Sequence, residues 1–189
     1  MRSIYTDGLA EIQRQVTFMR HAKSSWQDDQ VSDHDRPLNE RGKATAPLMG
    51  QALASILPKA PDLVLVSSAE RTQETWAYVK PALEAKFGEP STDYVLEELY
   101  LAPPAKLIEI LKTCDEAAYQ VLVFGHNPGL QELSLGVTAH GPVTAWRDMA
   151  ASFPTCAAAS FKFNGAWSDI NINQLRFQRF DTPRSLGLR

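Results

Sequence analysis

The sequence has few cysteines, short apolar runs and no excess of basic residues. Its two cysteines, Cys114 and Cys156, cannot build a disulfide framework, and their scarcity is typical of a reducing compartment. Apolar runs such as 63–66 and 121–124 are far below the roughly 20 residues of a transmembrane helix. The net charge of −3 offers no basic surface to nucleic acid or an anionic membrane. We expect a cytoplasmic protein with neither partner.

Two further absences narrow the function. No Gly-rich Walker loop or Gly-x-Gly-x-x-Gly run follows a predicted strand, which argues against a nucleotide-binding protein. The start of the chain is mixed polar and has no apolar signal-peptide region. We expect residues 1–15 to be an N-terminal extension and residues 16–189 to form a single domain.

The 189 residues, 44% of them apolar, suffice for one globular domain with its own core. Short apolar segments rich in β-branched residues predict strands at 16–18, 62–67, 94–96 and 120–125. Apolar residues at helical spacing predict helices at 39–57, 70–87, 103–112 and 128–137. This alternation predicts an α/β three-layer sandwich, with a mostly parallel central sheet and helices on both faces.

Two details modify that fold. The C-terminal third changes character, and its segments 156–163 and 174–180 predict an antiparallel extension of the sheet. Proline disrupts helix interiors, so the main part of the first helix should begin near Pro47. For the same reason, the second helix should bend or break before Pro81.

Charged side chains follow three of the predicted strands. Arg20 and His21 follow the first, Arg71 lies just beyond the second, and His126 and Asn127 follow the fourth. Ligands of open parallel sheets bind at the carboxyl ends of the strands, so these side chains should meet. Two arginines gathered on an acidic chain predict an anion pocket. Phosphate fits it best, because guanidinium offers paired donors to its oxygens.

Four segments resemble, in the same order, the sequence blocks of the histidine phosphatase superfamily, which includes the phosphoglycerate mutases. They are residues 19–23 (MRHAK), 38–42 (LNERG), 67–75 (SSAERTQET) and 123–128 (VFGHNP). Residues 36–38 (RPL) and 180–186 (FDTPRSL) resemble the SixA-type phosphohistidine phosphatases in particular. The resemblance implies a phosphoglycerate mutase-like fold. Ala22 and Ala69 replace the family's usual glycine and proline, and neither change removes a reactive group.

The resemblance also implies a mechanism. His21 matches the nucleophile, which would form a phosphohistidine enzyme that water then hydrolyses. Arg20 and Arg71 would hold the phosphoryl oxygens and keep His21 neutral, and a protonated His126 would be a further donor. These cations would do the work of a metal, so we expect no metal or other cofactor.

The remaining candidates have two readings each. Glu98 matches the position of the family's general acid, but it can equally be a surface residue at the end of a strand. Ser24 and Asn127 can bind substrate or belong to exposed loops. Asp33, His34 and Asp35 lie in the loop after the first motif and could reach the pocket, but a charged side chain in a loop is more often solvated.

The spacing of the motifs bears on the substrate. The intervals from His21 to Arg71 and from Arg71 to His126 leave little chain for a lid, which predicts an open pocket. Such a pocket suits a phosphohistidine presented on a protein. A mutase, which must retain its substrate between two transfers, would benefit from a lid and is less favoured. A small-molecule phosphomonoesterase and a non-catalytic phosphate- or phosphopeptide-binding module remain as alternatives. Inorganic phosphate and its analogues vanadate and tungstate should inhibit competitively.

Overall fold

The computed structural model describes residues 12–27, 29–88, 92–138 and 142–188. Six strands form one sheet in the order β3-β2-β4-β1-β5-β6. The strands are β1 (Gln13–Arg20), β2 (Leu63–Ser67), β3 (Thr92–Leu96), β4 (Gln120–Gly125), β5 (Ala158–Asn164) and β6 (Arg176–Asp181). The pairs β1–β4, β2–β3 and β2–β4 are parallel, whereas β1–β5 and β5–β6 are antiparallel. The predicted parallel sheet with an antiparallel extension is confirmed.

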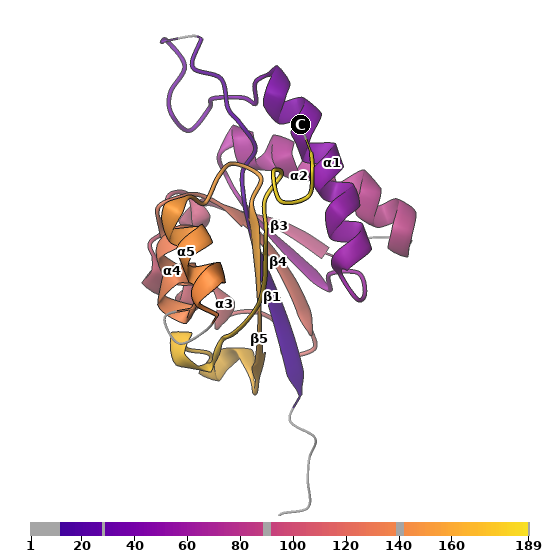
Figure 1. The fold of residues 1–189 in the computed structure, drawn as a ribbon, viewed down its shortest axis with the longest axis vertical. Helices are drawn as coiled ribbons and strands as arrows, with labels where there is room; N and C mark the ends of the chain where they lie inside the picture. The colour runs from indigo at the N-terminus through magenta and orange to yellow at the C-terminus, as the bar shows by residue number, and fades with distance from the viewer. Residues whose placement is uncertain (1–11, 28, 89–91, 139–141, 189) are drawn as a thin grey trace, which may run out of the picture.

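Helices cover both faces of this sheet (Figure 1). They are α1 (Glu40–Ile56), α2 (Glu70–Phe87), α3 (Pro104–Leu111), α4 (Gly129–Thr138) and α5 (Val143–Ala151). Helices α1 and α2 lie on one face, and α3, α4 and α5 lie on the other. Every residue of β2 and β4 is buried, which explains their continuous apolar sequences. No helix in the described ranges has the length and apolar character to cross a membrane.

Two prolines lie inside uninterrupted helices, contrary to the sequence prediction. Pro47 lies within α1 and Pro81 within α2. Both line a groove where the two helices pack together. The helices approach so closely that a Cβ on Gly50 would lie 2.9 Å from the carbonyl oxygen of Val79. This packing offsets the backbone hydrogen bond that each proline removes.

The first strand begins earlier than predicted, because β1 starts at Gln13. Residues 13–15, assigned to the extension by the sequence prediction, therefore belong to the sheet. Arg14 is buried there and forms an ion pair of 2.9 Å with Glu116. Residues 1–11 of the predicted extension lie outside the described part of the chain.

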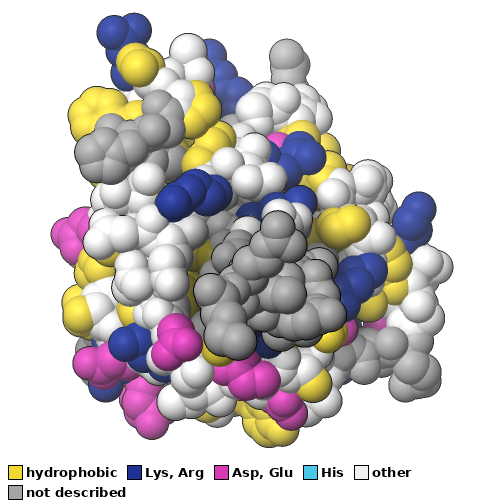
Figure 2. Space-filling view, turned by 90° about the horizontal axis from the view of Figure 1, so that it is seen from below, with side chains coloured by type: hydrophobic (Ala, Val, Ile, Leu, Met, Phe, Trp, Pro, Cys, Tyr) yellow, Lys and Arg dark blue, Asp and Glu magenta, His cyan; other side chains and the backbone are white. Residues whose placement is uncertain are grey.

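The two ends of the sheet carry different kinds of side chain. The amino end of β1 is at the bottom of Figure 1, and the view from below shows both acidic and basic side chains and no histidine (Figure 2). His21 and His126 follow the carboxyl ends of β1 and β4, at the opposite end of the sheet. The candidate site is therefore at the edge that the sequence predicts.

Candidate active site

Backbone hydrogen bonds hold His21 between two strands. Its N–H donates to the carbonyl of Gly125 at the end of β4, at 3.1 Å. Its carbonyl accepts from the N–H of Cys156, just before β5, at 3.1 Å. The position of the imidazole is thus fixed by the sheet rather than by a free loop.

The imidazole of His21 has one nitrogen engaged and one available. Its Nδ1 lies 2.7 Å from the carbonyl oxygen of Ala22, an acceptor that requires the proton to be on Nδ1. Nε2 then carries the lone pair in the neutral ring. Within the described residues, no hydrogen-bond partner occupies Nε2. This tautomer is the one a nucleophile needs.

The surroundings of His21 keep the ring neutral. Its pKa is lowered to about 3, first by burial and then by the positive charges of Arg71, Arg20 and Arg36. The hydrogen bond to Ala22 acts in the opposite direction. The sequence prediction ascribed the neutral ring to the arginines, whereas burial is the larger cause.

Three arginines converge on the same site, one more than the sequence analysis named. Arg71 is 2% exposed and Arg36 is 8% exposed. The Nε atoms of Arg20, Arg36 and Arg71 are buried, and the described residues offer them no hydrogen-bond partner. Buried unpaired donors are costly unless an acceptor meets them. What suits the three guanidinium groups to bind an oxyanion is that they line one cavity.

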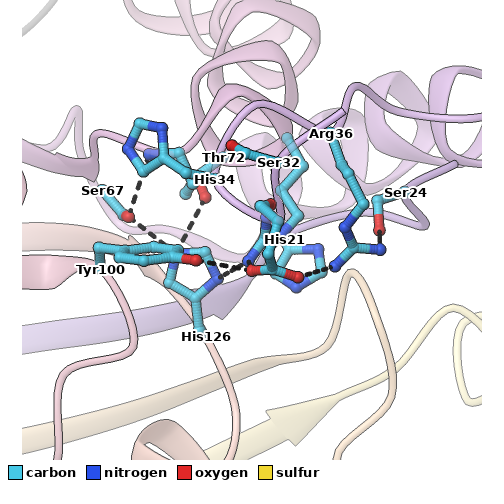
Figure 3. Close-up of polar contacts among 12 residues, drawn as sticks. His21, Ser24, Ser32, His34, Arg36, Ser67, Thr72, Tyr100 and His126 are labelled. Atoms are coloured by element: carbon cyan, nitrogen blue, oxygen red, sulfur yellow. Dashed lines mark hydrogen bonds and ion pairs between the residues drawn. The ribbon is translucent and has the colours of Figure 1, made fainter. Parts of the chain in front are cut away.

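A cavity of about 360 Å³ joins these residues. It is lined by Arg20, His21, Lys23, Ser24, Trp26, Asp33, Arg36, Arg71, Leu101, His126, Asn127 and Thr155. Figure 3 shows His21, Arg36 and His126 converging from different segments of the chain. His21 and His126 are buried, whereas Trp26 is 70% exposed and Leu101 is 49% exposed. The cavity therefore has a floor of buried histidine and arginine side chains and a rim with exposed apolar side chains.

His126 is held beside His21 by three side chains. Its Nε2 lies 2.7 Å from Ser67 Oγ and 3.3 Å from Thr72 Oγ1. Its Nδ1 accepts from Arg71 Nη2 at 3.4 Å. Burial, followed by the charges of His21 and Arg71, lowers the pKa of His126 to about 2. His126 is neutral in this arrangement, whereas the donor role predicted for it requires the protonated ring.

Sequence reasoning favoured a solvated loop charge for Asp33, whereas the structure places its carboxylate at the mouth of the cavity. Asp33 Oδ1 accepts from Arg36 Nη2 at 2.5 Å. Its Oδ2 accepts from Tyr100 Oη at 2.7 Å and from Arg71 Nη2 at 3.1 Å. The hydrogen bond from Tyr100 is the largest cause that lowers the pKa of Asp33 to about 2, and Arg36 and Arg71 add to it. Its partners Arg71 and Tyr100 are remote in sequence. Arg36 is only three residues away, but the sequence marked it only through the RPL run.

Ser24 and Asn127 line the cavity, and their described contacts are with other protein groups. Ser24 Oγ accepts from Arg36 Nη1 at 3.3 Å. Asn127 Nδ2 donates to the carbonyl of Phe153 at 3.1 Å, and Arg20 Nη1 donates to the same oxygen at 2.8 Å. Ser24 thus helps to position Arg36, whereas Asn127 shares an acceptor with Arg20. Substrate binding by either side chain remains a prediction.

Glu98 is not brought to the site. It is an exposed residue of the short helix η1 (Glu97–Leu99) and does not line the cavity. Its neighbour Glu97 lies nearer, with Oε2 at 3.8 Å from His34 Nε2. In the part of the chain that the structure describes, no group of three or more His, Cys, Asp or Glu side chains is arranged to hold a metal ion.

Known proteins share both the sequence blocks and the fold. Residues 16–108 match the histidine phosphatase superfamily (branch 1). An uncharacterized protein of Mycobacterium tuberculosis is 33% identical over 169 residues, which cover 88% of this chain and 100% of that protein. The chain belongs to the histidine phosphatase superfamily. The matched range includes His21, Arg36 and Arg71, which line the cavity described above.

Solved structures place this histidine phosphatase among the SixA-type members. A candidate SixA phosphohistidine phosphatase of Nakamurella multipartitia is 28% identical, with a TM-score of 0.74 over 90% of this chain and 96% of that one. The protein histidine phosphatase SixA complexed with tungstate is 26% identical, with a TM-score of 0.68 over 91% and 99% of the two chains. The predicted SixA type and phosphoglycerate mutase-like fold are confirmed. These relationships support a phosphatase activity.

Proposed function

We propose that this chain is a metal-independent phosphatase that hydrolyses phosphohistidine on a protein through a phosphorylated His21. The observation that carries the proposal is the hydrogen bond of 2.7 Å between His21 Nδ1 and the carbonyl of Ala22. It leaves the lone pair on Nε2 of a buried ring whose pKa is far below neutral. His21 is therefore an available nucleophile at neutral pH without a separate base.

In the first step, His21 Nε2 attacks phosphorus and the bond to the leaving group breaks. Charge on the transferring phosphoryl oxygens would be balanced by Arg20, Arg36 and Arg71, whose buried Nε donors lack protein partners in the described residues. Preorganised donors of this kind stabilise the transition state without reorganising during the reaction. The three cationic side chains can supply the charge stabilisation that many phosphatases take from a metal ion.

In the second step, water hydrolyses the phosphorylated His21. A phosphoryl dianion in the cavity would add negative charge next to His126, whose pKa is otherwise held low by burial and neighbouring charge. That charge favours the protonated ring, so His126 would acquire a proton as the substrate binds. It would then be the further donor that the mechanism requires.

Two observations favour phosphohistidine as the substrate. Imidazole departs more easily than an alkoxide, and no protonated carboxyl group among the described lining residues is available to protonate an alkoxide. The exposed rim around Trp26 and Leu101 would also admit a side chain presented by another protein. A small phosphomonoester is the second candidate, because a cavity of about 360 Å³ is within the size range of small-ligand sites.

A single-turnover assay tests the proposal. Wild type and His21→Ala would be mixed with a histidine-phosphorylated protein or with para-nitrophenyl phosphate, in the presence of a chelator. We expect wild type to clear phosphohistidine faster and to yield an acid-labile phosphoenzyme that His21→Ala lacks. His34→Ala is the matched control, since His34 lies outside the cavity lining, and it should still form the phosphoenzyme.

The alternatives give different results. Faster turnover of a small monoester than of phosphohistidine would favour the phosphomonoesterase. Tungstate binding without turnover of either substrate would indicate a phosphate-binding module. A phosphoenzyme in His21→Ala would overturn the nucleophile assignment.

A further inference from the structure

Asp33 is an anion inside a site suited to bind anions. Its carboxylate contacts Arg36 and Arg71, two of the three arginines around the cavity. A negative charge so close to a phosphoryl dianion weakens its binding. The side chain is nevertheless 46% exposed and lines the cavity rather than turning away from it. A role in the reaction would explain why a phosphatase holds a carboxylate at this point.

We propose that Asp33 selects for a phosphorylated nitrogen by accepting a hydrogen bond from the N–H of the leaving imidazole ring. The inference rests on the proposed function and assigns the specificity of that site to a residue outside the sequence blocks described above. Arg36 holds Oδ1, while Arg71 and Tyr100 hold Oδ2. An ionised carboxylate offers about four acceptor positions, so at least one is left for a ligand.

The transfer then balances without a general acid. The substrate ring carries its phosphoryl group on one nitrogen and a proton on the other, and this N–H donates a hydrogen bond to Asp33 while it keeps its proton. His21 Nε2 forms the new N–P bond, the old N–P bond breaks, and its electron pair returns to the substrate ring. The ring leaves as neutral imidazole, while His21, with its proton on Nδ1, becomes the phosphoimidazolium. The leaving group and the nucleophile are both imidazole rings, so the phosphoryl transfer needs no external proton.

An alkyl phosphomonoester gains nothing from Asp33. Its alkoxide leaving group needs a proton, and Asp33, with a pKa of about 2, is ionised at neutral pH and has none to give. The titratable and charged groups around Asp33 belong to four segments of the chain, near residues 20–36, 71, 100 and 126. Those that contact it or line the same cavity are Arg20, His21, Lys23, Arg36, Arg71, Tyr100 and His126, and its neighbours on the loop are His34 and Asp35.

Asp33→Asn tests this role, because it keeps the size of the side chain and removes its charge. The substrates are phosphoimidazole and para-nitrophenyl phosphate, which differ in the leaving atom, and tungstate is the inhibitor. For Asp33→Asn we expect kcat/KM on phosphoimidazole to fall about tenfold or more, as loss of a charge-assisted hydrogen bond implies. The fall in kcat/KM on para-nitrophenyl phosphate should be several-fold smaller, and tungstate should bind more tightly because a repulsive charge is gone.

The pH dependence of phosphoimidazole cleavage is a second measurement, and it would not change if Asp33 had only a structural role. A nearby carboxylate stabilises the protonated substrate ring, so in Asp33→Asn the loss of phosphoimidazole activity at high pH should begin about one pH unit lower. Asp35→Asn is the matched control. Asp35 is on the same loop, bonds to His34 and Ser32, and lies outside the cavity lining, so its variant should behave as wild type.

Each contrary result has a distinct meaning. Equal losses on both substrates with weaker tungstate binding would show that Asp33 only orders the arginines, and would overturn the inference. An unchanged substrate preference in a folded Asp33→Asn would do the same. Wild type that cleaves only the monoester would refute the proposed substrate and the inference together. Should Asp33→Asn fail to fold, Tyr100→Phe keeps the carboxylate and removes one of its donors; a folded Tyr100→Phe that loses the preference for phosphoimidazole would count against a role for the charge.

Discussion

The backbone N–H of Ala22, the residue after the nucleophile, donates a hydrogen bond of 2.9 Å to the hydroxyl of Thr75. The same hydroxyl donates to the carbonyl of Arg71 at 2.6 Å, one turn earlier in α2. A single buried side chain therefore connects the segment that holds His21 to the helix that carries Arg71. The distance between His21 and Arg71 depends on this connection.

Thr75→Val should damage both stability and activity. Valine has a similar shape but leaves the buried N–H of Ala22 without a partner, which costs about 1–3 kcal/mol of unfolding free energy. The freed segment should also lower the rate of phosphoenzyme formation. Urea unfolding and a rapid-quench assay measure the two effects. Thr45→Val, on the surface of α1, is the control, and equal stability of the two variants would contradict the prediction.

Gly42→Ala should disturb the segment that follows His21. Gly42 lies in the first turn of α1, and a Cβ there would overlap the carbonyl oxygen of Lys23. The backbone beside Ala22 must move to accommodate it, so we expect kcat to fall and thermal stability to decrease. Arg41→Ala, an exposed change in the same turn, controls for the helix itself. A fully active Gly42→Ala would show that this close contact does not position the site.

Stability should decrease at acid pH through two histidines. The pKa values of His21 and His126 are about 3 and about 2 in the folded protein, against 6.5 for an ordinary histidine. Since the unfolded chain binds these protons first, stability is intact above pH 6.5 and falls as the pH drops toward 3. The loss is at most about 1.4 kcal/mol per pH unit for each histidine.

Denaturant unfolding of wild type and His126→Gln measures this dependence. The variant should show a shallower decline between about pH 6.5 and 4.5, because one of the two groups no longer titrates. Between about pH 7.5 and 8.5 the two proteins should have parallel profiles, which provides the internal control. Equal slopes in the acid range would indicate that His126 is not held neutral by the fold.

Trp26→Ala should weaken anion binding without affecting the fold. The guanidinium of Arg36 lies over the Trp26 ring at 3.5 Å from its centroid, and the ring is mostly exposed. An exposed cation–π contact contributes about 0.5–1 kcal/mol, so tungstate should bind a few-fold more weakly when Arg36 is free to move. Calorimetry measures the affinity. Trp146→Ala removes another exposed tryptophan away from the cavity, and a loss of the same size there would argue against a specific role of Trp26.

The sequence predicted those site residues that have reactive or charged side chains and directly follow a strand. Arg20, His21 and His126 directly follow strands, and parallel pairing brings strand ends together. Neither Asp33 nor Tyr100 has such a local mark. They meet only because the loop after β1 folds back toward the end of β3, a tertiary contact that no periodicity encodes.

The helices predicted at 39–57 and 70–87 are present as α1 and α2, but the interruptions expected at their prolines are absent, for a related reason. Proline at positions 47 and 81 is unfavourable by intrinsic propensity, and this preference alone predicted two breaks. Packing of α1 against α2 buries Met49, Leu53 and Val79, and this burial outweighs the local cost. Propensity describes an isolated segment, whereas each of these helices is stabilised mainly by its neighbour.

The position of β1 in the middle of the sheet has a consequence for how the enzyme loses function. Both backbone groups of His21 are bonded, to Gly125 on one side and to Cys156 on the other. Amides in such interior strands exchange with solvent only when the whole molecule opens. The His21 amide should be among the last to take up deuterium, and proteases should find no partly open form that exposes the nucleophile. The protein should then lose its activity only when the whole molecule unfolds.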